Sequence, residues 1–340
     1  MDRQMKKWLL VAILAVVGAV LAACGNDDVK TASGENGETV IKYQMARATV
    51  YPAELAADLG YLEGIKLQSV SDFKGGTESI QLVGTGEIDL GNAFTGAVIK
   101  AASKNVKLHS VIGYYGSDEL TNIAAYVLEG SNIKEAKDLI GKKVGVNILG
   151  AHLEVVLKEY LLQGGLTDKE ISEVQLVTVP MTSAEQTLRA KQIDAVLLIG
   201  PAKDLAIERG GLTELFVDYE VIGQSFTAGN YFFSEKFAEE NPKVVKQFVE
   251  GVAKAIEWSR ETPREEVIER MENIIKKRDP NESIDNIKFW KSFGVASEGG
   301  VISDEEMQIW IDWLVKSGEL KEGEIKPSDL YTNEYNPYAK

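Results

Sequence analysis

Residues Phe73 to Gly96 read FKGGTESIQLVGTGEIDLGNAFTG, and this stretch decides the fold. Gly75 and Gly76 precede Thr77, a residue type that favours the start of a helix, and an apolar-periodic run follows. The apolar step from Ile88 to Leu90 predicts a short buried strand, after which a second helical run begins. This order brings two helix N-termini close together, and such termini offer unpaired N–H groups to a ligand.

The same arrangement returns 105 residues later in the chain. The recurring residues are Thr77, Gln81, Ile88 and Asp89 in the first copy and Thr182, Gln186, Ile193 and Asp194 in the second. The pattern favours two similar α/β lobes that face each other across a cleft, although two ordinary α/β units would also produce it. Asp89 and Asp194 hold equivalent places before a strand. We expect them to brace the lobes rather than to act as an acid–base pair.

The composition limits the class of protein. A chain of 340 residues with 44% hydrophobic and 26% charged residues is typical of a globular protein with about two domains. The first 23 residues carry three bases and one acid, so without them the formal charge changes from −15 to −17. Such an acidic chain lacks the basic surface that nucleic acid requires. Any anionic ligand must therefore be held by local groups, against the field of the whole protein.

The N-terminus has the layout of an export signal. Basic residues precede an apolar run from Trp8 to Ala23, which predicts a signal peptide over residues 1–23. The run is too short to favour a permanent membrane-spanning helix, which needs about 20 apolar residues. Leu21 to Gly25 resembles a bacterial lipobox, and we therefore expect lipidation of Cys24, the only cysteine. The alternative is a plain signal peptide with an incidental cysteine.

The rest of the chain offers little covalent chemistry. Strand and helix patterns alternate as far as Ser234, and almost wholly helical patterns follow, which predicts α/β lobes with a C-terminal helical cover. The two histidines, His109 and His152, are far apart in sequence, and no HExxH, CxxC, GxSxG or Walker motif occurs. We expect no catalytic residues, no metal and no cofactor.

Small polar and aromatic residues stand at predicted strand ends and helix starts. In open α/β sheets ligands bind beyond the carboxyl ends of the strands, so we expect a non-covalent binding cleft there. The candidate residues are Gln44, Thr77, Asn92, Thr95, Tyr114, Asn147, His152 and Thr182.

Several motifs, in order, resemble ABC-transporter substrate-binding lipoproteins of the nitrate/taurine/aliphatic-sulfonate group. They are the lipobox at Cys24, the Tyr43-Gln44 strand end, Phe73 to Thr77, Gly86 to Asp89, Gly141 to Leu166 and Asn241 to Ala255. The resemblance covers nearly everything after residue 38. It implies the type II periplasmic-binding-protein fold, in which two crossover strands join two α/β lobes.

The resemblance also implies boundaries and ligand contacts. Residues 24–38 would be a flexible tether, 39–125 with 228–340 the first lobe, and 126–227 the second, with a hinge at Tyr126 to Leu128 and Ser225 to Thr227. By motif, the ligand would touch Gln44, Gly76, Thr77, Asn92 to Thr95 (which includes Phe94), Asn147, Ala151, His152 and Thr182. Arg47 and Lys74 would add positive charge, and Tyr114 and Tyr115 would suit a flat or apolar tail.

The function that the resemblance implies is that of a lipid-anchored, extracytoplasmic receptor. As a monomer it would bind a small organic anion, such as an aliphatic sulfonate or a taurine-like compound, and deliver it to an ABC permease in the membrane. The tyrosines argue against nitrate, although nitrate and a pyrimidine precursor of thiamine stay open as alternatives. A further alternative is an enzyme that uses His152 as a base.

Overall fold

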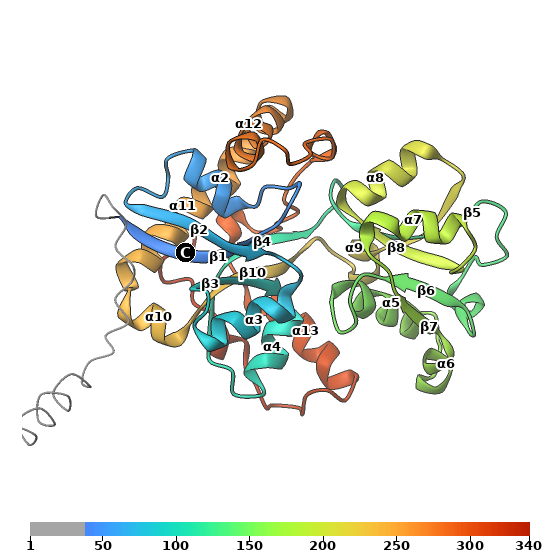
Figure 1. Ribbon diagram of the computed structural model, residues 1–340. Helices are drawn as coiled ribbons and strands as arrows, with labels where there is room; N and C mark the ends of the chain where they lie inside the picture. The colour runs from blue at the N-terminus through green and yellow to red at the C-terminus, as the bar shows by residue number, and fades with distance from the viewer. Residues whose placement is uncertain (1–37) are drawn as a thin grey trace, which may run out of the picture.

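The computed structural model describes residues 38–340, so the predicted signal peptide, Cys24 and all but the last residue of the predicted tether lie outside the described residues. Two α/β lobes lie side by side (Figure 1). One lobe contains the first and last parts of the chain, and the other contains the middle. In the described part of the chain, no helix is both long and apolar enough to cross a membrane.

The first lobe is built on two small sheets. Its strands are β1 (Thr39–Met45) and β2 (Ile65–Asp72), paired in parallel, and β3 (Leu90–Phe94), β10 (Phe226–Ser234) and β4 (Leu108–Ser117), which are antiparallel with β10 in the middle. Asp89 joins the two sheets. Its backbone N–H donates to the Lys42 carbonyl at 3.0 Å, and its carboxylate accepts the Lys42 N–H at 2.8 Å.

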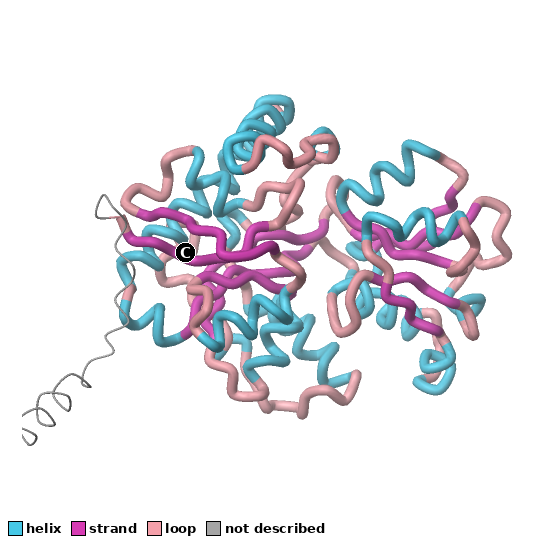
Figure 2. The backbone as a smooth tube through the Cα atoms, viewed as in Figure 1, coloured by secondary structure: helices cyan, strands magenta, loops and turns pink. Residues whose placement is uncertain are grey.

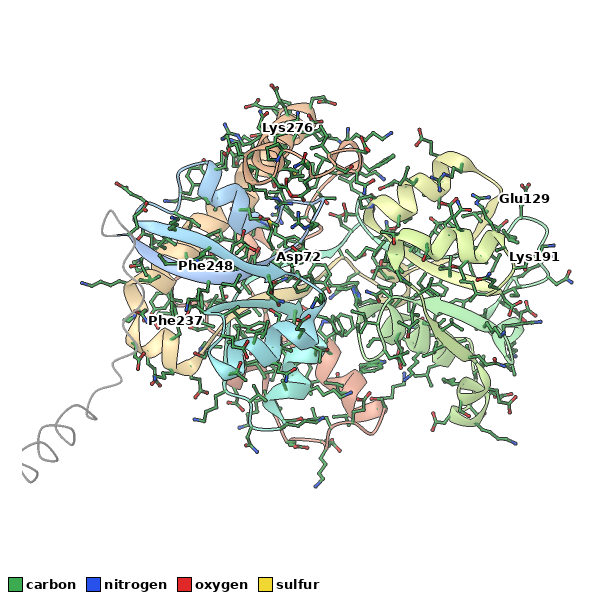
Figure 3. The ribbon with its side chains drawn as sticks, viewed as in Figure 1. Asp72, Glu129, Lys191, Phe237, Phe248 and Lys276 are labelled. Carbon is green, nitrogen blue, oxygen red and sulfur yellow. The ribbon has the colours of Figure 1, made fainter. Side chains whose placement is uncertain are left out.

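Helices cover the sheets of the first lobe (Figure 2). They are α2 (Pro52–Asp58), α3 (Gly76–Thr85), α4 (Thr95–Ala102), α10 (Glu235–Glu240), α11 (Pro242–Glu261), α12 (Arg264–Arg278) and α13 (Asp304–Lys316), with the 3₁₀ turns η2 (Ile287–Phe289), η3 (Glu298–Gly300) and η4 (Pro327–Asp329). Phe237 and Phe248 (Figure 3) pack around Phe233 of β10, with ring centroids 5.0 and 5.4 Å away. The C-terminal helices therefore complete the core of this lobe.

The second lobe has one sheet in the order β7-β6-β8-β5-β9. These strands are β5 (Ile123–Leu128), β6 (Lys143–Val146), β7 (Gln175–Thr178), β8 (Ala195–Ile199) and β9 (Leu212–Val217). The helices are α5 (His152–Gln163), α6 (Asp168–Glu173), α7 (Met181–Arg189), α8 (Gly200–Arg209) and α9 (Asp218–Ile222), with the 3₁₀ turn η1 (Ala136–Leu139).

The sequence repeat corresponds to one equivalent helix–strand unit in each lobe. Thr77 and Thr182 are the second residues of α3 and α7. Asp194 repeats the geometry of Asp89: its N–H donates to the Lys143 carbonyl at 2.8 Å, and its carboxylate accepts the Lys143 N–H at 2.8 Å. The prediction that the two aspartates brace the lobes is confirmed.

The predicted hinge was wrong at the first crossing, and at the second only Ser225 lies in the connecting segment. Tyr126 to Leu128 lie inside β5, which pairs with β8 and β9, and Phe226 and Thr227 already belong to β10. The chain crosses between the lobes in segment 118–122, between β4 and β5, and in segment 223–225, between α9 and β10. Alternating apolar residues identify a strand, but they do not reveal which sheet it joins.

Asp218 holds the two ends of the first crossing segment together. This fully buried residue accepts three hydrogen bonds on Oδ1: from Ser117 Oγ at 2.5 Å, the Ile123 N–H at 3.1 Å and the Tyr219 N–H at 2.9 Å. Ser117 ends β4 and Ile123 begins β5, so one oxygen atom links the last strand before the crossing to the first strand after it.

We predict that Asp218→Ala lowers the free energy of unfolding by about 3 kcal/mol, because three buried donors lose their acceptor at about 1 kcal/mol or more each. Asp218→Asn should cost less, since its amide oxygen replaces Oδ1 and no charge remains buried. Urea denaturation of both variants measures the difference. A loss below about 1 kcal/mol in the alanine variant would contradict the role of Asp218.

Candidate functional site

A cleft of about 390 Å³ lies between the lobes and is lined by both. Hollows of about 550 and 570 Å³ lie on the outer surface, one beside Lys276 and one at Glu129 and Lys191 (Figure 3). In the first of these, Asp58 is already paired with Arg270 at 2.8 Å. The interlobe cleft combines apolar walls with few polar groups, as ligand sites generally do, and it is the candidate site.

Aromatic rings form one continuous wall of the cleft. The wall residues are Phe73, Tyr51, Tyr114, Tyr115, His152 and Phe94. Successive ring centroids along this series are 6.3, 5.3, 4.8, 6.1 and 5.1 Å apart. Such a wall offers flat apolar surface to the body of a small organic molecule.

The N-termini of three helices open on the cleft. Gly76 is the first residue of α3, His152 the first of α5 and Gly200 the first of α8, and all three line the cleft. None of these helices has a side-chain hydrogen bond at its N-cap. Each helix N-terminus carries about half a positive charge together with unpaired N–H groups, so the cleft attracts an anionic group locally.

His152 is held inside an aromatic cage. It is 4% exposed, stacks on Phe94, and has Phe226 and Trp310 at centroid distances of 5.6 and 5.8 Å. Neither ring nitrogen has a hydrogen-bond partner, and Nε2 lies 3.7 Å from Asp218 Oδ2, which is too long for a hydrogen bond. Burial lowers the pKa of His152 to about 3 and raises the pKa of Asp218 to about 6. The ring is therefore neutral at pH 7, with one donor and one acceptor.

The structure brings half of the predicted site residues together on the cleft. These are Gly76, Phe94, Tyr114, Asn147, Ala151 and His152. The side-chain oxygen of Asn147 is buried without a partner, so it is an acceptor still open to a ligand.

The other predicted residues lie away from the lining, for specific reasons. Gln44 is buried and ties β1 to β2, since its Nε2 donates to Ser71 Oγ and the Asp72 carbonyl, both at 3.3 Å. Arg47 is occupied by ion pairs to Asp72 at 3.1 Å and Asp279 at 3.0 Å.

Four more predicted residues are also outside the lining. Thr95 is buried and accepts a hydrogen bond from Asn230 at 3.0 Å, and Asn92 is buried beside Tyr114. Thr77 and Thr182, the second residues of α3 and α7, are exposed and do not line the cleft.

The sequence reasoning missed several lining residues. They are Tyr51, Phe73, Asn122, Ile148, Lys203 and the segment 286–293 with Trp290. Phe73 begins the stretch Phe73 to Gly96, whose sequence predicted a helix start at the neighbouring glycines. The segment 286–293 carries no periodic signal, and only tertiary packing brings it to the cleft.

We predict that His152 makes folding stability depend on pH. The unfolded chain binds a proton at His152 below about pH 6.5, whereas the folded protein resists it down to about pH 3, so stability is lost as the pH falls through this window. At pH 5 the loss is about 2 kcal/mol. Urea denaturation at pH 8 and pH 5 should show this extra loss in the wild type but not in His152→Phe. Equal pH dependence in both proteins would contradict a buried neutral ring.

Comparisons with known proteins agree with this architecture. The profile of the NMT1/THI5-like family matches residues 48–266, well over half of the chain. A protein named as a binding protein in Brucella abortus (strain 2308) is 24% identical over 271 residues, which cover 77% of this chain and 80% of that protein. The taurine-binding periplasmic protein of Escherichia coli (strain K12) is 25% identical over 188 residues, 54% of each chain.

Among solved structures, the periplasmic aliphatic sulphonate binding protein SsuA from Escherichia coli superposes with a TM-score of 0.63 at 20% identity, over 85% of this chain and 91% of that one. This likeness shows that the two-lobed architecture is the periplasmic-binding-protein fold. Together with the profile match, it establishes that the chain belongs to the NMT1/THI5-like family.

Proposed function

We propose that this protein is the solute-binding component of an ABC importer and that its ligand is a small organic anion, such as an aliphatic sulfonate or a taurine-like compound. The observation that carries the proposal is that the uncapped N-termini of α3, α5 and α8 open on one aromatic-walled cleft. The family, and the similarity to a taurine-binding and a sulphonate-binding periplasmic protein, support it.

Different parts of the site recognise different parts of the ligand. N–H groups at the helix starts donate hydrogen bonds to the charged head of the ligand, and the aromatic wall contacts its body. With a formal charge of −17 beyond the predicted signal peptide, long-range attraction cannot supply the affinity, so short hydrogen bonds must. We propose binding rather than catalysis, because His152 donates to and accepts from no protein group in its cage.

Lobe closure would convert binding into a shape that the permease recognises. The lobes already touch on both sides of the cleft. A Cβ on Gly75 would lie 2.8 Å from Ile148 Cδ1, and Lys291 pairs with Asp204 at 2.8 Å. A third contact, between Lys316 and Glu159 at 3.2 Å, joins α13 to α5. These contacts would break when the lobes separate to release the ligand.

The open acceptor on Asn147 favours a second candidate class. Sulfonate and nitrate groups carry only acceptors at neutral pH, whereas Asn147 Oδ1 needs a donor. The ammonium group of taurine supplies one, and so does the amino group of a pyrimidine precursor of thiamine. Nitrate offers neither a donor nor a body for the aromatic wall.

The cellular setting is also part of the proposal. We propose that the protein works as a monomer on the extracytoplasmic face of the cell membrane, anchored through lipidated Cys24, beside its permease. The anchor is supported by the lipobox-like sequence Leu21 to Gly25 alone.

Thermal-shift measurements with taurine, alkanesulfonates, an aminopyrimidine and nitrate test the ligand class. A ligand at one hundred times its dissociation constant adds about 2.7 kcal/mol of stability. We expect a shift with taurine or an alkanesulfonate. A shift with the aminopyrimidine alone would overturn the anion assignment in favour of the second candidate.

We predict that Thr77→Pro weakens sulfonate binding by at least about 1.5 kcal/mol, because it removes one N–H from the first turn of α3. Proline is tolerated in a first turn, so the helix should persist. Arg47→Ala is the control, since Arg47 is already paired with two carboxylates. Titration calorimetry measures both variants, with circular dichroism to confirm folding. Loss of binding in the Arg47 variant alone would mean that a salt bridge holds the ligand.

A further inference from the structure

Lys203 is a buried cation with no ion-pair partner. It lies one turn into α8, is 6% exposed and lines the cleft. Its ammonium group donates to the side-chain oxygen of Asn122, a neutral acceptor that also lines the cleft. Among residues 38–340, no carboxylate lies within 4 Å of its Nζ. The neighbouring Asp204 is instead engaged by Lys291 at 2.8 Å.

Both the burial of Lys203 and its position in the first turn of α8 are unfavourable for a positive charge. A buried charge without a counter-charge is costly, and this burial lowers the pKa of Lys203. The position is also wrong for a cation, because the first turn of a helix favours negative charge. The nearby charges are mixed: Asp204, Asp218 and Glu214 favour the charged form of Lys203, and Lys291 opposes it. A bound anion would remove both penalties at once.

We infer that Lys203 is a specificity-determining residue that pairs directly with the anionic group of the ligand, beside the N-terminus of α8. The inference rests on the proposed function and deepens it, because it separates anions from neutral molecules of the same shape. Lys203 also connects the ligand to the crossing segment: Asn122, its partner, donates to the Asp118 carbonyl at 3.0 Å. The anion therefore sits one side chain away from the segment that joins the lobes.

The test compares ethanesulfonate with ethanesulfonamide, its neutral counterpart, by titration calorimetry on the full chain. Wild type should prefer the sulfonate, and Lys203→Met should lose at least about tenfold of that preference, because hydrogen bonds to charged groups are stronger than neutral ones. Lys107→Met is the matched control: it removes the same charge outside the cleft lining, where Lys107 is exposed and pairs with Glu235 at 3.0 Å. The preference of this control variant for ethanesulfonate over ethanesulfonamide should stay within about twofold of that of wild type.

Urea denaturation without ligand provides a readout that a structural lysine would not give. If Lys203 serves recognition, Lys203→Met removes an uncompensated buried charge and raises the denaturation midpoint above that of wild type. A lowered midpoint, or an unchanged preference for the sulfonate, would overturn the inference and leave the proposed function standing. A wild type that binds neither compound would overturn the anionic ligand itself, and the role of Lys203 with it.

Discussion

One buried carboxylate, that of Asp218, lies where the two lobes join and holds the chain there. Asp218 Oδ1 accepts bonds from the end of β4, from the start of β5 and from its own helix α9, so both ends of the first crossing segment converge on one atom. The second oxygen of Asp218 faces His152, whose ring is enclosed by aromatic residues of the other lobe. The floor of the cleft and the joint between the lobes are therefore parts of one packed structure.

The cleft is locally positive inside an acidic protein. Three other helices are capped by side chains, with Thr167 on α6, Ser234 on α10 and Ser303 on α13, whereas α4, α7, α9, α11 and α12 have no such hydrogen bond. The three helices that open on the cleft have no such caps, so their N–H groups stay available. What sets these three helices apart is their position, because their first residues all line one cleft.

The sequence predicted the architecture because periodicity and the 105-residue repeat are local signals. It identified the helix starts at Gly76 and His152, which do line the cleft. It misplaced Gln44 and Arg47, because a residue type at a strand end does not reveal which neighbours will occupy its side chain. Lys203 was missed for a related reason. Its burial depends on packing by other segments of the chain, which residue spacing does not predict.

The first lobe is assembled from both ends of the chain, and this imposes an order on folding. The second lobe is one continuous segment, from β5 to β9. The first lobe requires β10 to pair between β3 and β4. This pairing brings Asn230 to Thr95, 135 residues away in sequence, where the two side chains form a hydrogen bond. Closing so long a loop costs entropy before its contacts form. The second lobe can therefore form while the first is still incomplete, whereas the cleft requires both lobes.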